Sequence, residues 1–312
     1  QYLQLNNSNG AGTINGIWDL IDDTVIGGFY GTWNFIAYCF AEVDGYSKFG
    51  SYTGTGANGN SIVTGFRPAY VMIKKTNNTG SWTIIDNKRD SSNPIEKFLK
   101  ANDSSSEGTA SNYADFNSNG FTLNTSSGNN SGDTFIYLAF AEENVQPEPE
   151  LANSFNVVTY TGNGSTQAVT GLGFQPDLVW MKNRDSAYSH RIFDSVRGAD
   201  VTISSDTTNA EYDGGGTGYM SSFDSNGFTL SSSNVNTNAN GTNYVAWAWK
   251  ASNDSTINQD GSITSIVSAN PAAGFSVCSY TGTGSNASFG HGLSSVPELV
   301  IVKRTSASED WF

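Results

Sequence analysis

The apolar residues of this chain fall in short runs that are rich in β-branched and aromatic types. Examples are FNVVTYT at 155–161, DLVWMKN at 177–183 and NYVAWAW at 243–249. Clusters of Gly, Asn, Asp and Ser separate these runs at intervals of about 8 to 20 residues, which is the spacing of strands in sandwiches and barrels. Only the segment at 94–101, which contains PIEKFLK, predicts a helical turn. We therefore expect an all-β protein.

The same strings return along the chain. SYTGTG at 51–56 recurs as TYTGNG at 159–164 and as SYTGTG at 279–284, with the tyrosines Tyr52, Tyr160 and Tyr280 in equivalent places. DFNSNGFTL at 115–123 matches SFDSNGFTL at 222–230, and aromatic runs begin at 34, 134 and 243. Self-similarity over about 100 residues indicates an array of similar domains.

The order of these strings predicts four segments. Residues 1–42 form the C-terminal half of a repeat, 43–146 a full β-sandwich repeat, 147–272 a second full repeat with an extra linker strand, and 273–312 the N-terminal half of a repeat. The expected fold is all-β, with tandem antiparallel β-sandwich repeats of jelly-roll type. QPEPE at 146–150 predicts a hinge, whereas the segment from Asn258 predicts an ordered extra strand.

The two half-repeats are complementary. They could complete one sandwich within the chain, or between successive subunits of a filament. In either case, residues equivalent to those from Ile84 to Glu96 would be missing from the composite domain.

The strings NYVAWAWKA, QDGSITSIVSANPAAGFSVCSYTGTGS and GHGLSSVPELVIVKR carry a family resemblance. They resemble a repeat domain of marine bacteriophage virion and tail proteins, which are fibre-like and often carry the repeats downstream of SPRY or concanavalin-like modules. The resemblance implies an extracellular location at the virion surface and a non-enzymatic, structural role.

Charge and hydropathy narrow the range of partners. The net charge of −14 argues against nucleic acid, because a phosphate backbone requires a basic surface. No run of apolar residues is long enough to span a bilayer, so membrane insertion is not expected. The start QYLQLNN does not look like a signal peptide, so we expect release by cell lysis or an N-terminus further upstream. Expected partners are other copies of the chain, as a trimer or head-to-tail filament, neighbouring virion proteins, and a host surface glycan.

The sequence offers few candidates for catalysis or cofactor binding. The histidines His190 and His291 predict an exposed strand end and a turn, and they suggest neither a catalytic triad nor a zinc site. Cys39 and Cys278 are expected to be buried free thiols. No cofactor is expected, although calcium held by Asp and backbone carbonyls, for example near DGGGTG at 213–218, stays possible. A glycosidase would need a pair of acids, and the candidates are Asp86, Asp90, Asp185 and Asp194. We favour the interpretation that these carboxylates are solvated or ion-paired.

One polar pattern recurs in both full repeats. Asp86 and Arg89 in IIDNKR match Asp194 and Arg197 in IFDSVR. The pattern fits either a ligand clamp or, preferably, an ion pair that fixes a turn. Each repeat also has a lysine after an apolar strand, and these are expected to snorkel at strand ends: Lys74, Lys182 and Lys303.

Two classes of function compete. The repeats could be architectural modules of a tail fibre, spike or capsid appendage, or they could bind host polysaccharide through exposed aromatics and the clamp; a glycoside hydrolase is the least favoured alternative. The candidate binding residues are Trp82, Asp86, Arg89, Tyr188, Asp194 and Arg197, together with Trp180 and Tyr219, for all of which core packing or an ion pair is the competing interpretation. The strand and turn strings are the most similar parts of the repeats, which favours architecture.

Overall fold

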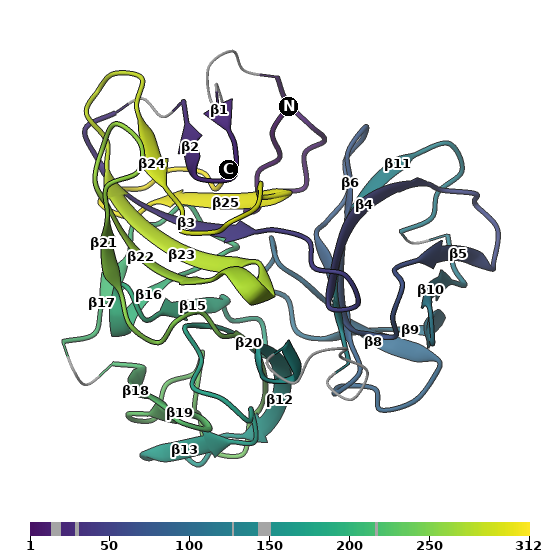
Figure 1. The fold of residues 1–312 in the computed structure, drawn as a ribbon. Helices are drawn as coiled ribbons and strands as arrows, with labels where there is room; N and C mark the ends of the chain where they lie inside the picture. The colour runs from purple at the N-terminus through teal and green to yellow at the C-terminus, as the bar shows by residue number, and fades with distance from the viewer. Residues whose placement is uncertain (14–19, 29–30, 127, 143–150, 216–217) are drawn as a thin grey trace.

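A computed structural model describes residues 1–13, 20–28, 31–126, 128–142, 151–215 and 218–312. In these residues the fold is all-β with antiparallel sheets, as the sequence predicts. The helical segments that these residues contain are two single 3₁₀ turns, η2 (Leu151–Asn153) and η3 (Pro271–Ala273). Three similar β units surround a common centre, and Figure 1 shows them as three lobes.

Unit 1 follows the first full repeat. Its sheet has eight strands in the order β4-β11-β6-β7-β8-β9-β10-β5. The strands are β4 (Ser47–Thr53), β5 (Asn60–Val63), β6 (Pro68–Lys75), β7 (Thr83–Asp86), β8 (Ile95–Lys100), β9 (Gly108–Asn117), β10 (Gly120–Leu123) and β11 (Thr134–Ala141).

Unit 2 follows the second full repeat. It has a six-stranded sheet, β12-β20-β14-β15-β16-β17, and a three-stranded sheet, β13-β19-β18. The strands are β12 (Phe155–Thr161), β13 (Gln167–Thr170), β14 (Leu178–Asn183), β15 (Arg191–Asp194), β16 (Gly198–Ile203), β17 (Tyr212–Asp213), β18 (Met220–Asp224), β19 (Gly227–Leu230) and β20 (Asn243–Trp249).

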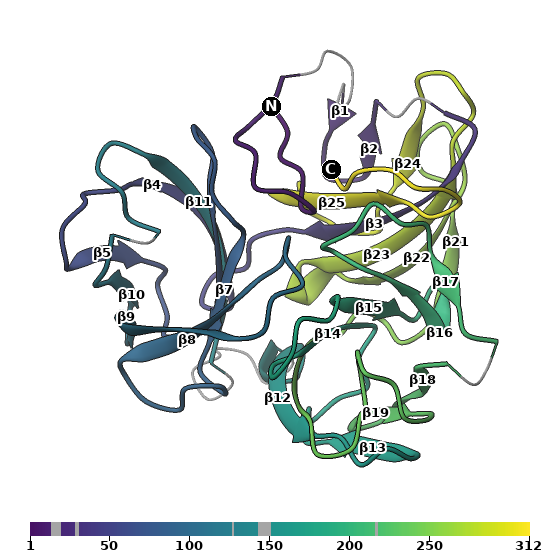
Figure 2. The same ribbon diagram turned by 180° about the vertical axis from the view of Figure 1, so that it is seen from behind.

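Unit 3 combines the two half-repeats of the same chain. Strand β3 pairs with β23 on one side and with β25 on the other, so the complementary halves join within the chain. Figure 2 shows both ends of the chain in this unit. The strands are β1 (Leu20–Ile21), β2 (Val25–Gly27), β3 (Asn34–Phe40), β21 (Thr256–Asn258), β22 (Ser265–Asn270), β23 (Phe275–Thr281), β24 (Ser288–Gly290) and β25 (Leu299–Arg304).

The repeated tyrosines occupy equivalent places in the three units. Tyr52, Tyr160 and Tyr280 each lie near the end of the first strand and face an aromatic residue on the neighbouring strand. The rings stack at centroid distances of 5.1, 5.2 and 5.2 Å. The internal repeat is therefore structural as well as sequential.

The repeated NGF turn requires glycine because of a close backbone approach. Gly120 and Gly227 have φ angles of 150° and 152°. A Cβ atom would lie 2.0 Å from the Ile62 carbonyl oxygen at the first position and 1.9 Å from that of Val169 at the second. This approach brings β10 against β5 and β19 against β13.

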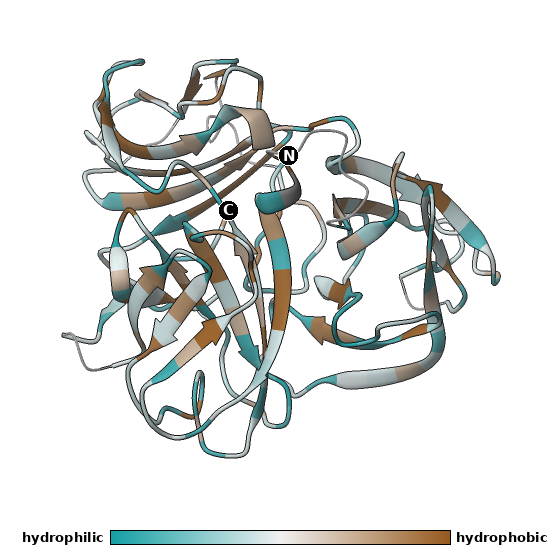
Figure 3. Ribbon diagram, turned by 60° about the horizontal axis from the view of Figure 1, so that its bottom comes forward, coloured by the Kyte–Doolittle hydropathy of each residue, from teal (hydrophilic) through white to brown (hydrophobic). Residues whose placement is uncertain are grey.

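Each unit has its own apolar core, and a fourth core joins the three units at the centre. The equivalent residues Phe40, Phe140 and Trp249 meet there, with ring centroids 6.0, 6.2 and 5.7 Å apart. Figure 3 shows that the apolar segments lie mainly on strands. Close packing of aromatic rings from all three units makes the ring of units one body.

Two expectations about local structure have different outcomes. The helical turn predicted near 94–101 is wrong, because β8 occupies these residues. A register shift lies between Ile95 and Lys97, and Ile95 and Leu99 are buried in different cores, so the strand does not show a regular alternation of apolar residues. The extra strand predicted after Asn258 is present as β22, but it pairs with β23 in the sheet of unit 3, whereas the sequence assigns it to the second full repeat. The hinge predicted at 146–150 lies outside the described residues.

Candidate functional site

The residues singled out by the sequence lie mainly at the contacts between units. Trp82, Asp86, Arg89 and Asp194 are buried, and the side chain of Arg197 is 7% exposed. The ion-pair and core-packing interpretation preferred from the sequence describes these five in the structure, because their polar atoms bond to other parts of the chain. Tyr188 is exposed. Trp180 is buried in the central core and Tyr219 in the core of unit 2.

The first Asp-x-x-Arg pair joins unit 1 to unit 2. Arg89 Nε donates to Asp86 Oδ2 at 2.6 Å, and both side chains are fully buried. Trp247 of β20 in unit 2 donates from Nε1 to the same oxygen at 3.0 Å. The other carboxylate oxygen accepts the backbone N–H of Arg89 at 2.9 Å. The carboxylate is therefore held by partners from two units and has no face open to a ligand.

The second pair repeats this arrangement between units 2 and 3. Arg197 Nε donates to Asp194 Oδ2 at 2.7 Å, and the Tyr38 hydroxyl of β3 donates to it at 2.8 Å. Burial, followed by the charge of Asp194, raises the pKa of Tyr38 well above its ordinary value. Tyr38 and Trp247 occupy equivalent positions on β3 and β20, so one pattern forms both contacts.

A second set of hydrogen bonds also joins each unit to a neighbouring unit. Trp82 Nε1 donates to the Gln4 carbonyl, and Trp311 Nε1 donates to the Ser204 carbonyl, both at 2.9 Å. His190 Nε2 bonds to the Lys100 carbonyl at the same distance. Trp82 and His190 lie directly before β7 and β15, and Trp311 has the equivalent position in the third repeat. The three contacts link unit 1 to unit 3, unit 3 to unit 2, and unit 2 to unit 1.

His190 is a buried neutral imidazole, which corrects the expectation of an exposed strand end. Trp180 Nε1, which can only donate, bonds to His190 Nδ1 at 2.9 Å, so Nε2 carries the proton that goes to Lys100. Burial, and next the nearby charge of Lys182, lowers the pKa of His190 to about 3. Protonation of Nδ1 would point its N–H at the indole N–H of Trp180, and the hydrogen bond between these two side chains would be lost.

The buried state of His190 predicts acid sensitivity. Between the folded pKa of about 3 and the ordinary value of 6.5, the unfolded chain binds the proton and the folded chain does not, so stability is lost as pH falls through this window. We expect His190→Gln, which can keep both hydrogen bonds, to reduce the loss between pH 7 and pH 4 by about 2–3 kcal/mol. Urea unfolding at the two pH values measures this difference.

The neighbouring ionisable groups define the control for this experiment. Asp206 accepts the His190 backbone N–H, and Lys182 and Arg89 contribute positive charge. His291 has a smaller lowering of its pKa, so His291→Gln is the matched variant and should change the acid response less. An acid response that is identical in wild type and His190→Gln would contradict the assignment.

The repeated lysines do not snorkel, which corrects that expectation. Lys74, Lys182 and Lys303 are fully buried. Lys74 Nζ donates to the carbonyls of Ser8, Asn9 and Gly80 at 3.1, 2.6 and 2.6 Å, so it joins its own loop to unit 3. Burial lowers the pKa of each lysine to about 8. The carbonyls take the place of water around the ammonium group.

The remaining candidates are structural in the described part of the chain. His291 lies in a loop, as expected, but is buried, and its Nε2 bonds to the Asp22 carbonyl. Cys39 and Cys278 are buried free thiols, as expected. Asp90 pairs with Lys97, and Asp185 bonds to Asn243. Among the described residues, no group of three His, Cys, Asp or Glu side chains could hold a metal ion.

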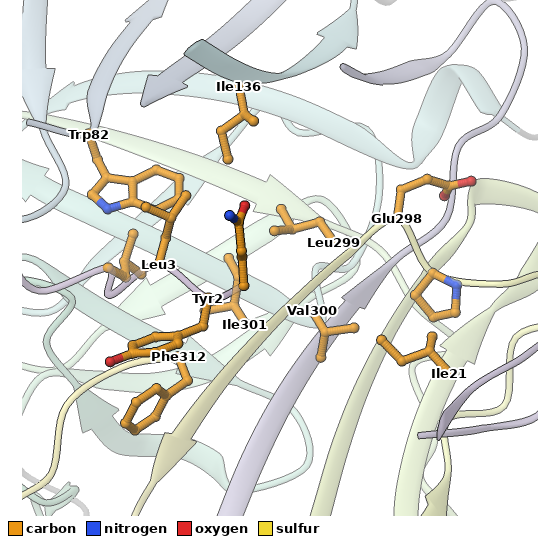
Figure 4. Close-up of a pocket in the computed structure, with 13 residues that line it drawn as sticks. Tyr2, Leu3, Ile21, Trp82, Ile136, Glu298, Leu299, Val300, Ile301 and Phe312 are labelled. Atoms are coloured by element: carbon orange, nitrogen blue, oxygen red, sulfur yellow. The ribbon is translucent and has the colours of Figure 1, made fainter. Parts of the chain in front are cut away.

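One cavity lies between units 3 and 1, and Figure 4 shows its lining. It has a volume of about 330 Å³. Tyr2, Leu3 and Phe312 gather at one end, and Glu298 and Ile21 at the other. Its walls are mostly apolar, and among the described residues that line it Glu298 has the only charged side chain, which suits an apolar occupant better than a charged substrate.

Comparison with known proteins identifies the family. The profile of a domain of unknown function, DUF7483, matches residues 1–144 and 151–312. The chain belongs to the DUF7483 family. No curated protein and no solved structure matches it. For this DUF7483 chain, no helix in the described residues is long and apolar enough to cross a membrane.

Sequence reasoning missed the partners of the clamp residues. Tyr38 and Trp247 lie in other repeats than the carboxylates they bind, so spacing within a repeat does not reveal them. The sequence does contain a signal for the role of His190. Alignment of IIDNKR with IFDSVR places His190 at the position equivalent to Trp82. In this DUF7483 chain the shared feature of that position is a ring N–H that donates to a carbonyl of another unit.

Proposed function

We propose that this chain is a non-enzymatic structural module of a bacteriophage appendage, such as a tail fibre, spike or capsid fibre, exposed on the virion surface. The observation that carries the proposal is that the recurrent polar residues make contacts between units. Both Asp-x-x-Arg pairs and the ring N–H donors connect unit to unit inside the molecule. Because these repeated polar residues bond to one another, they hold the units in a fixed arrangement and do not form a repeated reaction centre.

The surface is compatible with an extracellular assembly role. The net charge of −14 favours solubility, and disulfides are not needed because each unit has a sizeable core of its own. The resemblance of the repeats to virion and tail proteins supplies the kind of assembly. Partners would be neighbouring virion proteins or further copies of the chain.

Localisation in the particle tests this function. In purified particles of a phage that encodes the chain, mass spectrometry should detect it at a fixed ratio to the major tail or capsid protein. Immunogold electron microscopy should then place the label on an appendage. Detection in the lysate together with absence from the particles would contradict the proposal.

Glycan binding is the second candidate, and one observation favours it. Of the six predicted binding residues, Tyr188 has an exposed ring, with 38% of the residue accessible. An exposed tyrosine ring can stack on a sugar. Saturable binding to host polysaccharide that is lost in Tyr188→Ala, and kept in the exposed control Tyr212→Ala, would replace the purely structural function by receptor binding.

A further inference from the structure

A second cavity lies within unit 1, at a place where the two full repeats differ. Residues of β6, β7, β8 and β11 and of the loop at 124–133 form its walls. Its volume is about 410 Å³, which is within the range of small-molecule sites. It is lined by, among others, Lys75, Thr83, Phe98, Lys100 and Phe135.

The loop that borders the cavity is different in unit 2. The loop at 124–133 is two residues shorter than the equivalent loop at 231–242. The longer loop is tied to the strands, because the Asn183 side chain donates to the Val235 carbonyl at 2.7 Å and the Tyr244 hydroxyl donates to it at 3.1 Å. The residues of unit 1 at these two strand positions are Lys75 and Phe135. A phenyl ring has no hydroxyl with which to hold a loop in this way.

A long side chain also occupies this region in unit 2. Arg191, the first residue of β15, donates to Ser204 Oγ at 3.1 Å and lies 5.0 Å from the centre of the Tyr219 ring. The first residue of β7 in unit 1 is the smaller Thr83, which pairs with Lys100. The cavity therefore results from a smaller side chain as well as from a shorter loop.

The lining of the cavity combines an aromatic surface with hydrogen-bonding groups. Phe98 is half-buried and stacks on Tyr113, with ring centroids 5.8 Å apart. Lys100 Nζ lies 4.0 Å from Asp103, and 38% of the lysine side chain is exposed, so the ammonium group can donate to a ligand. Thr83 adds a hydroxyl group. A pyranose ring fits this combination, because it has an apolar face that packs on an aromatic ring and hydroxyl groups at its edge.

The charges around the cavity favour a neutral sugar over an acidic one. Lys75 Nζ is 2.6 Å from Asp133 Oδ2, so its charge is compensated, and Asp103 lies near Lys100. The net charge of −14 repels a polyanion at long range. A polysaccharide of uronic or sialic acids would therefore bind less well than a neutral one.

We propose that this cavity binds a neutral hexopyranose unit of a saccharide. The Phe98 ring packs against the apolar face of the sugar, and the Lys100 ammonium and the Thr83 hydroxyl bond to its hydroxyl groups. This site is separate from Tyr188, which lies in unit 2. It adds a binding activity to the structural function proposed above.

Saturation-transfer NMR tests the site with the full 312-residue protein. The probes are the methyl glycosides of glucose, galactose, mannose and N-acetylglucosamine, together with the charged methyl glucuronide. We expect saturable binding of at least one neutral glycoside, with an affinity that does not change between about 20 mM and about 500 mM sodium chloride. Failure of all the neutral glycosides to bind overturns the proposal, as does tighter binding of the glucuronide that salt weakens.

Variants locate the binding. Thr83→Arg together with Lys100→Ser places the Arg191 and Ser204 pair of unit 2 in the cavity, and should weaken binding at least about tenfold. The control Thr53→Arg adds the same side chain at an exposed position of β4 and should leave the affinity unchanged. Equal binding by the wild type and the folded double variant would remove the sugar from this cavity.

A single variant keeps the test decisive if the double variant does not fold. Phe98→Leu retains an apolar side chain but removes the flat ring, and it should also weaken binding at least about tenfold. Far-UV circular dichroism and the midpoint of urea unfolding verify the fold of each variant. Unchanged affinity in folded Phe98→Leu contradicts the proposed packing of the sugar.

The structural function fails by a different result. Sugar binding by a chain that is absent from phage particles would retain the cavity site and overturn only the virion function. A chain that is present in particles but binds none of the neutral glycosides would retain the structural function and overturn the sugar site.

Discussion

Replacing Arg89 with alanine is expected to lower the free energy of unfolding by about 3–5 kcal/mol, because the change leaves the Asp86 carboxylate buried without its counter-charge. The guanidinium is fully buried. It donates to Asp86 at 2.6 Å and to the Ile84 carbonyl at 3.0 Å, and it lies 5.7 Å from the centre of the Trp247 ring. Urea unfolding at neutral pH, followed by circular dichroism, measures the loss.

An exposed ion pair of unit 1 provides the control. Arg67 and Glu142 are 3.0 Å apart, with about a third of each side chain exposed (32% and 34%). Arg67→Ala should cost about 0–1 kcal/mol, because water solvates the remaining carboxylate. The double variant Asp86→Leu with Arg89→Met should lose less than Arg89→Ala alone, since no unpaired charge stays buried. Equal losses for Arg67→Ala and Arg89→Ala would contradict the interpretation of the clamp.

The sequence predicts strands and repeats well because both are local. Short β-branched and aromatic runs between turn residues define strands such as β12 and β20, and the recurring YTG strings indicate equivalent strands. The exception is β8, where a register shift lies between two apolar residues, Ile95 and Leu99, that are buried in different cores. Local pattern cannot reveal that shift, because the shift depends on the pairing with β9.

The closure of the ring is not visible in the sequence. Complementary half-repeats leave pairing within a chain and between chains equally open, because both make the same strand contacts. In the structure the half-repeats pair within the chain, because β3 pairs with β23 and β25. Side-chain bonds reinforce this closure, for example from Asn6 and Gln4 to Asp310 at 2.7 Å. Closure also creates the central core.

The environment of the candidate site residues depends on neighbouring units. A histidine or lysine near a strand end is exposed in most proteins, which is why His190 and Lys74 were expected at the surface. Here the strand ends turn toward the next unit, so His190 meets the Lys100 carbonyl and Lys74 meets the carbonyls of Ser8 and Asn9. Only a map of contacts between repeats could have predicted their burial.

The second large effect is expected at the centre of the ring. Trp249 lies within 5.0 to 6.2 Å of Phe155, Phe140, Tyr70 and Phe40, measured between ring centroids, so it touches rings from all three units. Trp249→Ala should therefore cost about 3–5 kcal/mol through lost contacts and a cavity. The exposed Trp33→Ala should cost less than about 1 kcal/mol.

The shared position of Trp249 also predicts how the protein unfolds. A residue that belongs to the contact of all three units should shift one common transition, so calorimetry should show a single peak that moves to lower temperature in Trp249→Ala. Trp249→Phe should be milder, because the buried indole N–H has no hydrogen-bond partner among the described residues and the smaller ring removes that polar group. Separate transitions, of which Trp249→Ala moves only the one from unit 2, would show instead that the units are stable alone and that the central core does not couple them.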